Sequence, residues 1–141
     1  MSTPATEAPP STVLVFSHRP QVRDTIVNAV GRRPAPDLGR VSWVEAGTIA
    51  EVLALLDAGG VDLAVFDGEA QPTGGMGLCR QVKYEITSCP PIVVVVRRAD
   101  DRWLATWSLA DAVLVHPLDP LTAAQTVADV LRAAALPVVR G

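Results

Sequence analysis

Short apolar runs alternate with stretches of helical periodicity along the chain, and this alternation sets the narrowest limit on its fold. Most of the runs are continuous, as in strands that are covered on both faces of a sheet. One run, at 40–44, alternates polar with apolar residues and is therefore expected at a sheet edge. The expected strands lie at 12–16, 40–44, 63–66, 92–96 and 112–115.

Between these runs, apolar residues recur at spacings of three and four, which is typical of amphipathic helices. Thr48 and Glu51 form a capping-box pattern, Asp119 is expected to cap the last helix, and Gly31 and the Gly59–Gly60 pair are expected to end the first two. The helices are expected around 22–30, 49–56, 78–86, 103–107 and 120–131, the last burying Ala124, Val127, Ala128 and Leu131. Five strand-then-helix units predict an α/β fold with an open parallel sheet between helices.

The 141 residues suffice for one domain, and the hydrophobic fraction of 49% excludes a disordered chain. We expect a tail at 1–11, a domain at 12–136 and a short end at 137–141. The net charge of −3 argues against a nucleic-acid partner. No apolar run is long enough to span a membrane, no signal peptide is recognisable, and Cys79 and Cys89 lack metal-finger spacing. These features predict a soluble cytoplasmic protein with reduced thiols.

In open α/β sheets, chemistry is found at the carboxyl ends of the strands. Those ends carry Ser17, His18, Arg19, Asp67, Gly68, Glu69, Val96, Arg97 and His116. His18, Asp67 and His116 could converge there as ligands of a transition metal. The alternative interpretation is that His18 is a solvent-facing loop residue and that the proline-fixed backbone holds His116. Nucleotide-binding glycine motifs and a nucleophile elbow are both missing from the sequence.

Four segments in this order and spacing resemble a receiver domain of bacterial response regulators, over residues 12–135. They are the first strand with its following loop at 13–20 and Arg23, the segment 61–67 ending in Asp67, the strand at 91–96, and the stretch 110–120 that contains His116-Pro117. The resemblance implies a flavodoxin-like, doubly wound (βα)5 sandwich with strand order 2-1-3-4-5. It also implies that Asp67 is the counterpart of the aspartate that accepts a phosphoryl group.

The other elements of the family's phosphorylation site are replaced. Ser17 and His18 stand where the family has an acidic pair that holds Mg²⁺, and neither is a good ligand for a hard cation. Val96 stands in place of a serine or threonine that contacts the phosphoryl group, and His116 in place of a lysine that neutralises it. In the family, a proline follows the aspartate by four residues, and a glycine that opens the third helix follows it by eight. The loop after Asp67 is expected to differ, because Pro72 comes later and Gly77 is the glycine that directly precedes the helical pattern. We therefore expect a degenerate receiver that binds no Mg²⁺ and no other cofactor.

The fourth helix carries the residue types that protein interfaces favour, namely tryptophan and arginine. We predict an interaction face there, with at least one tryptophan packed on the sheet. Its residues are Arg97, Arg98, Arg102, Trp103 and Trp107. In the resembled family, partners or a second copy bind the face made by the fourth helix, fifth strand and fifth helix.

The sequence thus favours a stand-alone bacterial pseudo-receiver that signals by binding another protein, with no enzymatic activity and no catalytic residues. Homodimerisation through the fourth-helix face is one form that such binding could take. Two alternatives stay open at this stage. One is a single-domain phosphoreceiver that accepts a phosphoryl group on Asp67. The other is a metal or small-ligand sensor that uses the histidine-lined crevice.

Overall fold

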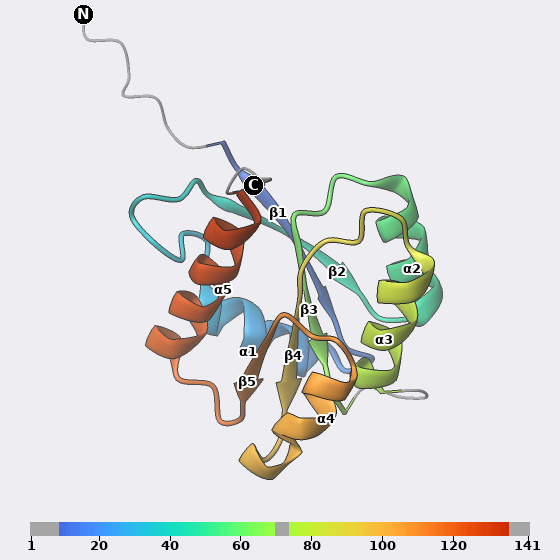
Figure 1. Ribbon diagram of the computed structural model, residues 1–141. Coiled ribbons are helices and arrows are strands. Elements are labelled where there is room, and N and C mark those ends of the chain that lie inside the picture. Colours follow the sequence, from blue (N-terminus) through green and yellow to red (C-terminus); the bar gives the residue numbers. More distant parts are fainter. Residues whose placement is uncertain (1–8, 70–73, 136–141) are drawn as a thin grey trace, which may run out of the picture.

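A five-stranded parallel sheet in the order β2-β1-β3-β4-β5 forms the centre of the protein (Figure 1). It is seen in a computed structural model that describes residues 9–69 and 74–135. The strands are β1 (Ser11–Phe16), β2 (Val41–Ala46), β3 (Leu63–Asp67), β4 (Ile92–Val96) and β5 (Ala112–Val115). The predicted flavodoxin-like (βα)5 architecture and its strand order 2-1-3-4-5 are confirmed.

Helices cover both faces of this sheet, with α1 and α5 on one side and α2, α3 and α4 on the other (Figure 1). Each helix follows the strand of the same number, so every connection is a crossover between parallel strands. The helices are α1 (Pro20–Val30), α2 (Ile49–Ala58), α3 (Gly75–Glu85), α4 (Arg102–Trp107) and α5 (Pro120–Ala135), with a 3-10 turn η1 (Ala99–Asp101) before α4.

The inner strands β3 and β4 explain why apolar runs in the sequence are continuous. Every residue of β3 and β4 is buried, because each strand has a neighbour on both edges and a helical layer on both faces. Phe16 of β1 and Phe66 of β3 pack edge to face in this core, with ring centroids 5.9 Å apart. The core therefore fixes the ends of β1, β3 and β4, where the polar residues lie.

Local sequence signals begin and end the helices as expected. The Thr48 hydroxyl accepts a hydrogen bond from the Glu51 N–H at 3.2 Å, and Gly31 ends α1 with φ +79°. Asp119 caps α5 through the Thr122 N–H at 2.9 Å. One part of the α5 prediction is wrong, because Ala123 belongs to the fully buried face and Ala124 is only half-buried.

Element bounds differ from the predictions at two places that matter below. β2 ends at Ala46, two residues later than expected, and its place at a sheet edge is confirmed. α3 begins at Gly75, so the expectation that Gly77 precedes this helix is wrong. Three predicted features lie wholly or partly outside the described residues, namely the tail up to residue 8, Pro72 and the end at 137–141. Ser11, which the predicted tail included, is already part of β1.

None of the described helices combines the length and apolar character that a membrane crossing requires.

Candidate functional site

Asp67 is the last residue of β3 and lies at the carboxyl edge of the sheet. Its main chain is in register with Val95 of β4, and β1 flanks β3 on the other side. Only 1% of Asp67 is accessible to solvent. A buried carboxylate needs hydrogen-bond donors or a countercharge, so its neighbours decide what it can do.

The Asp67 carboxylate receives both from its own chain. The Ser17 hydroxyl donates to Oδ2 at 2.8 Å, and Nη2 of Arg19 lies 3.8 Å from the same oxygen. The main-chain N–H of Glu69 donates to Oδ1 at 2.9 Å. Both oxygens therefore have a protein partner, and an arginine supplies the nearby positive charge.

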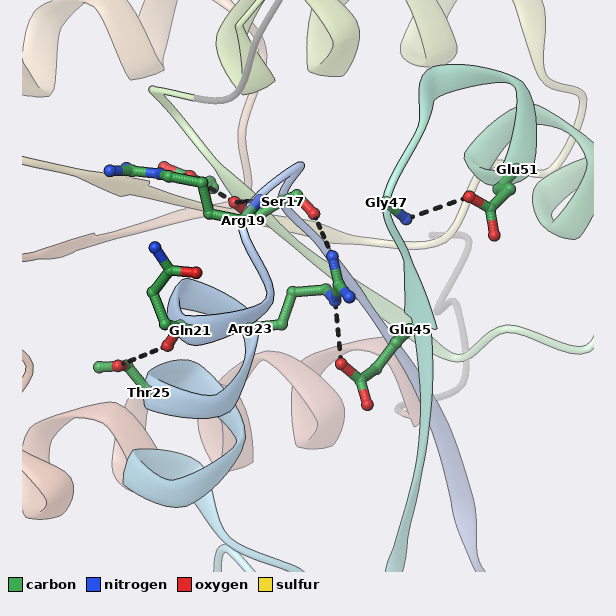
Figure 2. Close-up of polar contacts among 9 residues, drawn as sticks. Ser17, Arg19, Gln21, Arg23, Thr25, Glu45, Gly47 and Glu51 are labelled. Atoms are coloured by element: carbon green, nitrogen blue, oxygen red, sulfur yellow. Dashed lines mark hydrogen bonds and ion pairs between the residues drawn. The ribbon is translucent and has the colours of Figure 1, made fainter.

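The turn between β1 and α1 positions Ser17 for this contact. Ser17 is fully buried, and its hydroxyl also accepts the Arg19 N–H at 3.1 Å. Nη1 of Arg23 donates to the Ser17 carbonyl at 2.6 Å, while Nε of Arg23 binds Glu45 of β2 at 2.9 Å (Figure 2). Arg23 thus ties the turn to the neighbouring strand, which holds the Ser17 side chain over Asp67.

The Arg19 side chain reaches from the solvent to the Asp67 carboxylate. Its side chain is 36% exposed, but its Nε is buried and has no hydrogen-bond partner among the described residues. The attraction to Asp67 offsets part of the cost of burying this end of the guanidinium group. A second cation placed beside Asp67 would meet repulsion from Arg19.

Two glycines allow the chain to close tightly around Asp67. A Cβ on Gly68 would lie 2.7 Å from the Val95 carbonyl oxygen, and one on Gly75 would collide with the carbonyl group of Asp67 itself. Gly75 follows Asp67 by eight residues, which is the spacing that the receiver resemblance implies for the glycine that opens the third helix. The expected departure at this glycine is therefore wrong, because the helical pattern obscured the first turn of α3.

The remaining predicted positions, Val96, His116 and His18, lie at or just after the carboxyl ends of β4, β5 and β1. Val96 is buried at the end of β4, and the His116 N–H donates to its carbonyl at 2.9 Å. His116 is half-buried and His18 is exposed. Within 9–69 and 74–135, no three histidine, cysteine or acidic side chains are grouped so that they could hold a metal ion. The structure does not bring His18, Asp67 and His116 together as a ligand set.

Both cysteines are free thiols, and neither is activated as a nucleophile. Burial raises the pKa of Cys79 to about 11, and burial also raises the pKa of Cys89. The thiolate is the reactive form, so these shifts leave the thiols largely protonated at neutral pH.

The fourth helix differs from its prediction in one respect. Trp103 is 67% exposed and Trp107 is 51% exposed, so the expectation that one tryptophan packs on the sheet is wrong. α4 is only six residues long, and Leu104 and Ser108, one turn apart, face the molecule in place of the tryptophans. Arg97, Arg98 and Arg102 are exposed as predicted.

Arg80 of α3 connects this helix to its neighbour, a link that the sequence analysis missed. The guanidinium carbon of Arg80 lies 4.6 Å from the Trp107 ring centroid and 5.3 Å from that of Tyr84. Nη1 of Arg80 also donates to the Trp107 carbonyl at 2.7 Å. The spacing of Arg80 and Tyr84, one helical turn apart, was the only signal in the sequence. Trp103, Trp107, Tyr84, Arg80 and Leu109 are called the aromatic surface below.

The arrangement of sheet, helices and strand-end aspartate is that of a receiver domain. Solved structures with the same fold include the receiver domain of a Francisella response regulator (TM-score 0.72, 15% identity, covering 87% of this chain and 98% of that one). A two-component response regulator from Clostridium difficile is similarly close (TM-score 0.72, 18% identity, 89% and 99%). So is the receiver domain of NarL from Mycobacterium tuberculosis (TM-score 0.69, 22% identity, 89% and 98%).

Sequence comparison gives the family directly. The chain is 49% identical over 123 residues to an uncharacterised response regulatory protein of Mycobacterium tuberculosis, found in strains CDC 1551 and H37Rv. The match covers 87% of this chain and 92% of the relative. A search against family models found no match. The chain belongs to the response-regulator family, and its domain is a receiver of two-component signalling.

Proposed function

We propose that this protein is an atypical response regulator that signals by binding another protein and does not depend on Mg²⁺-assisted phosphorylation. The observation that carries the proposal is that the Asp67 carboxylate already has partners within its own chain. Its two carboxylate oxygens already bind the Ser17 hydroxyl, the Arg19 guanidinium and the Glu69 N–H. The proposal includes no enzymatic turnover and no bound cofactor.

Phosphorylation of a carboxylate needs a free oxygen and positive charge that screens the incoming phosphoryl group. Mg²⁺ supplies this charge in most phosphoryl-transfer sites, and it prefers carboxylate oxygens. Here the places of the acidic pair hold a buried serine and an exposed histidine. Arg19 places a positive charge beside Asp67, which disfavours a metal ion and leaves the aspartate without its usual activation.

Beryllofluoride binding with Mg²⁺ tests this proposal. We expect no change in the amide NMR signals of Asp67, Glu69 or Val96 at millimolar Mg²⁺ and beryllofluoride, and no phosphoryl adduct by intact mass after treatment with acetyl phosphate. The matched variant replaces Ser17→Asp, His18→Asp and His116→Lys, which restores three of the family's residues. Mg²⁺-dependent shifts in this variant alone support the proposal, whereas a stoichiometric adduct on the wild-type Asp67 overturns it.

Partner binding is proposed to use the aromatic surface. An exposed tryptophan and an arginine whose guanidinium group contacts aromatic rings are typical of interface hot spots, because their large areas lose little side-chain entropy on binding. Leu109 adds to the surface with 43% exposure and a backbone φ of +69°. That conformation is strained for a leucine, where glycine would be the easier choice.

Size-exclusion chromatography and partner titration test this surface. Trp107→Ala is expected to weaken a complex or a homodimer by about 2 kcal/mol or more, with a small change in melting temperature. Leu121→Ala is the matched control, because Leu121 on α5 is an apolar side chain with 79% exposure outside the surface. Equal loss in both variants, or loss only in an Asp67→Ala variant, would place the interaction elsewhere.

A single-domain phosphoreceiver is the second candidate function, and one observation favours it. Asp67 ends β3, and Gly75 opens α3 at the family spacing, so the frame of a phosphorylation site is kept. In this alternative, Arg19 releases the Asp67 carboxylate and contacts the incoming phosphoryl group. It then supplies the positive charge that Mg²⁺ gives elsewhere. An adduct that forms without Mg²⁺ and disappears in Arg19→Ala is its specific signature.

A further inference from the structure

The outer edge of β2 offers main-chain groups that no other strand uses, although at its start the Arg32 carbonyl already accepts the Val41 N–H at 2.6 Å. β2 is the last strand of the sheet, beside β1 only. Ser11 N–H bonds to the Arg40 carbonyl and Ser17 N–H to the Ala46 carbonyl, so the even-numbered residues of β2 face β1. In a strand, neighbouring residues direct their main-chain groups to opposite sides. The N–H and C=O groups of Trp43 and Glu45 therefore point away from the sheet.

A groove follows this edge. It has a volume of about 510 Å³, and consecutive β2 residues Val41, Ser42 and Trp43 line it together with Glu45. Val27 of α1 forms its other wall, while Arg32 and Arg40 also line it. Because the groove runs along successive strand residues, an extended chain fits it better than a compact ligand does.

The charge around this edge is opposite in sign to that of the whole chain. Arg32 and Arg40, which line the groove, are exposed, and neither forms an ion pair within the part of the chain that the structure describes. Glu45 is the only acid among the described residues that line the groove, and it is already paired with Arg23 at 2.9 Å. Two arginines without an acidic partner among the described residues thus lie beside an open strand in a chain of net charge −3.

We propose that the β2 edge binds an acidic protein segment in extended conformation, which adds to the sheet as a sixth strand. The segment's main chain bonds the outward groups of Trp43 and Glu45. Its carboxylates face Arg32 and Arg40, and apolar side chains contact Val27 and Trp43. This edge is separate from Asp67 and from the aromatic surface, so the protein would be able to hold two partners at once.

A synthetic acidic peptide tests the inference with the intact protein. The probe is a blocked, fluorescein-labelled Glu-Val-Asp-Val-Glu-Val peptide, and the control probe replaces its acidic residues by lysine. We expect saturable binding of the acidic probe alone, and slower amide hydrogen exchange at Trp43 and Glu45 when it is bound. Arg32→Glu combined with Arg40→Glu should weaken binding by about tenfold or more.

The matched control reverses two arginines on the other side of the molecule, Arg97→Glu and Arg102→Glu, and should leave probe affinity within about twofold. Circular dichroism of each variant checks that it is folded. A lack of binding, equal binding of both double variants, or binding without slower exchange at Trp43 and Glu45 overturns the proposal. So does tighter binding of a single-stranded oligothymidylate, which would make the arginines a nucleic-acid surface. None of these results depends on phosphorylation or on Trp107, so they are separable from the tests above.

Discussion

Asp67 shows how neighbouring side chains change the chemistry that one residue can perform. The receiver resemblance implies that this carboxylate, at the end of the third strand, is the counterpart of a phosphoacceptor. The Ser17 hydroxyl and the Arg19 guanidinium bind Oδ2 of this carboxylate, and the Glu69 N–H binds Oδ1. The same contacts satisfy a carboxylate that is only 1% exposed, so we expect them to contribute to stability.

Removing the Ser17 hydroxyl tests that contribution. Ser17→Ala should lower the free energy of unfolding by about 1–3 kcal/mol, because it leaves a buried carboxylate oxygen without its closest donor. Urea denaturation measures the change. In an Asp67→Ala background the same substitution should cost much less, and a double-mutant cycle that shows no coupling between the two residues would contradict the contact.

Gly75 carries a steric constraint that is equally local. A Cβ at this position would collide with the Asp67 carbonyl, so Gly75→Ala should destabilise the protein by about 1–3 kcal/mol through forced backbone movement. Gly77→Ala in the same helix is the comparison, since alanine is the better helix former. Thermal unfolding of the two variants should separate them clearly. Similar melting temperatures would mean that the loop relaxes around the added methyl group.

The helix α5 depends on a titratable cap. The Asp119 carboxylate accepts hydrogen bonds from the hydroxyl and the N–H of Thr122, and these bonds hold its pKa below the ordinary value of 3.8. A lowered pKa in the folded state means that the stabilisation is complete above the unfolded value. It is lost as the pH falls through the folded value.

Asp119→Ala should therefore be less stable than wild type at neutral pH, and the difference should shrink as the pH falls below 3.8. Asp119→Asn keeps a capping side chain without the charge, so its stability should be the less pH-dependent of the two relative to wild type. Denaturation curves measured between pH 2 and pH 7, a range that includes the titration of an ordinary aspartate, provide the measurement. A difference that stays constant across this range would show that the carboxylate charge plays no part.

The accuracy of the sequence analysis followed the length and burial of each element. β3 and β4 were predicted closely because strands covered on both faces are continuous apolar runs. α4 was misjudged because six residues are too few for helical periodicity to show which side is buried. The first turn of α3 was missed because Gly74, Gly75 and Gly77 carry no apolar pattern. The ring stack on Arg80 and the Arg19 contact to Asp67 join residues distant in sequence, and only the folded chain reveals them.

At the level of the whole molecule, Asp111 joins α3, β4 and β5 at the amino ends of the strands, opposite the carboxyl ends where Asp67 lies. Its Oδ2 accepts the Lys83 Nζ of α3 at 2.6 Å and the Ile92 N–H of β4 at 2.7 Å, while Asp111 itself directly precedes β5. Because Asp111 is 40% exposed, solvent screens the ion pair, and the main-chain bond is the larger part of the contribution.

Asp111→Ala should accordingly cost about 1 kcal/mol or somewhat more of unfolding free energy, since it leaves the Ile92 N–H without its partner. Lys83→Met removes only the ion pair and should cost less. Chemical denaturation at low and high salt distinguishes the two contributions. A larger effect for Lys83→Met than for Asp111→Ala would reverse this assignment.

The contacts of Asp67 also bear on how a cell could control such a protein. A receiver that a phosphoryl group switches can respond within seconds without new synthesis. With its aspartate already satisfied by Ser17 and Arg19, the proposed atypical receiver has a single signalling state. Its output then follows mass action, and raising partner occupancy from about 10% to about 90% takes a roughly eighty-fold rise in free concentration. Transcription and proteolysis, which act over minutes, would set the tempo of its signal.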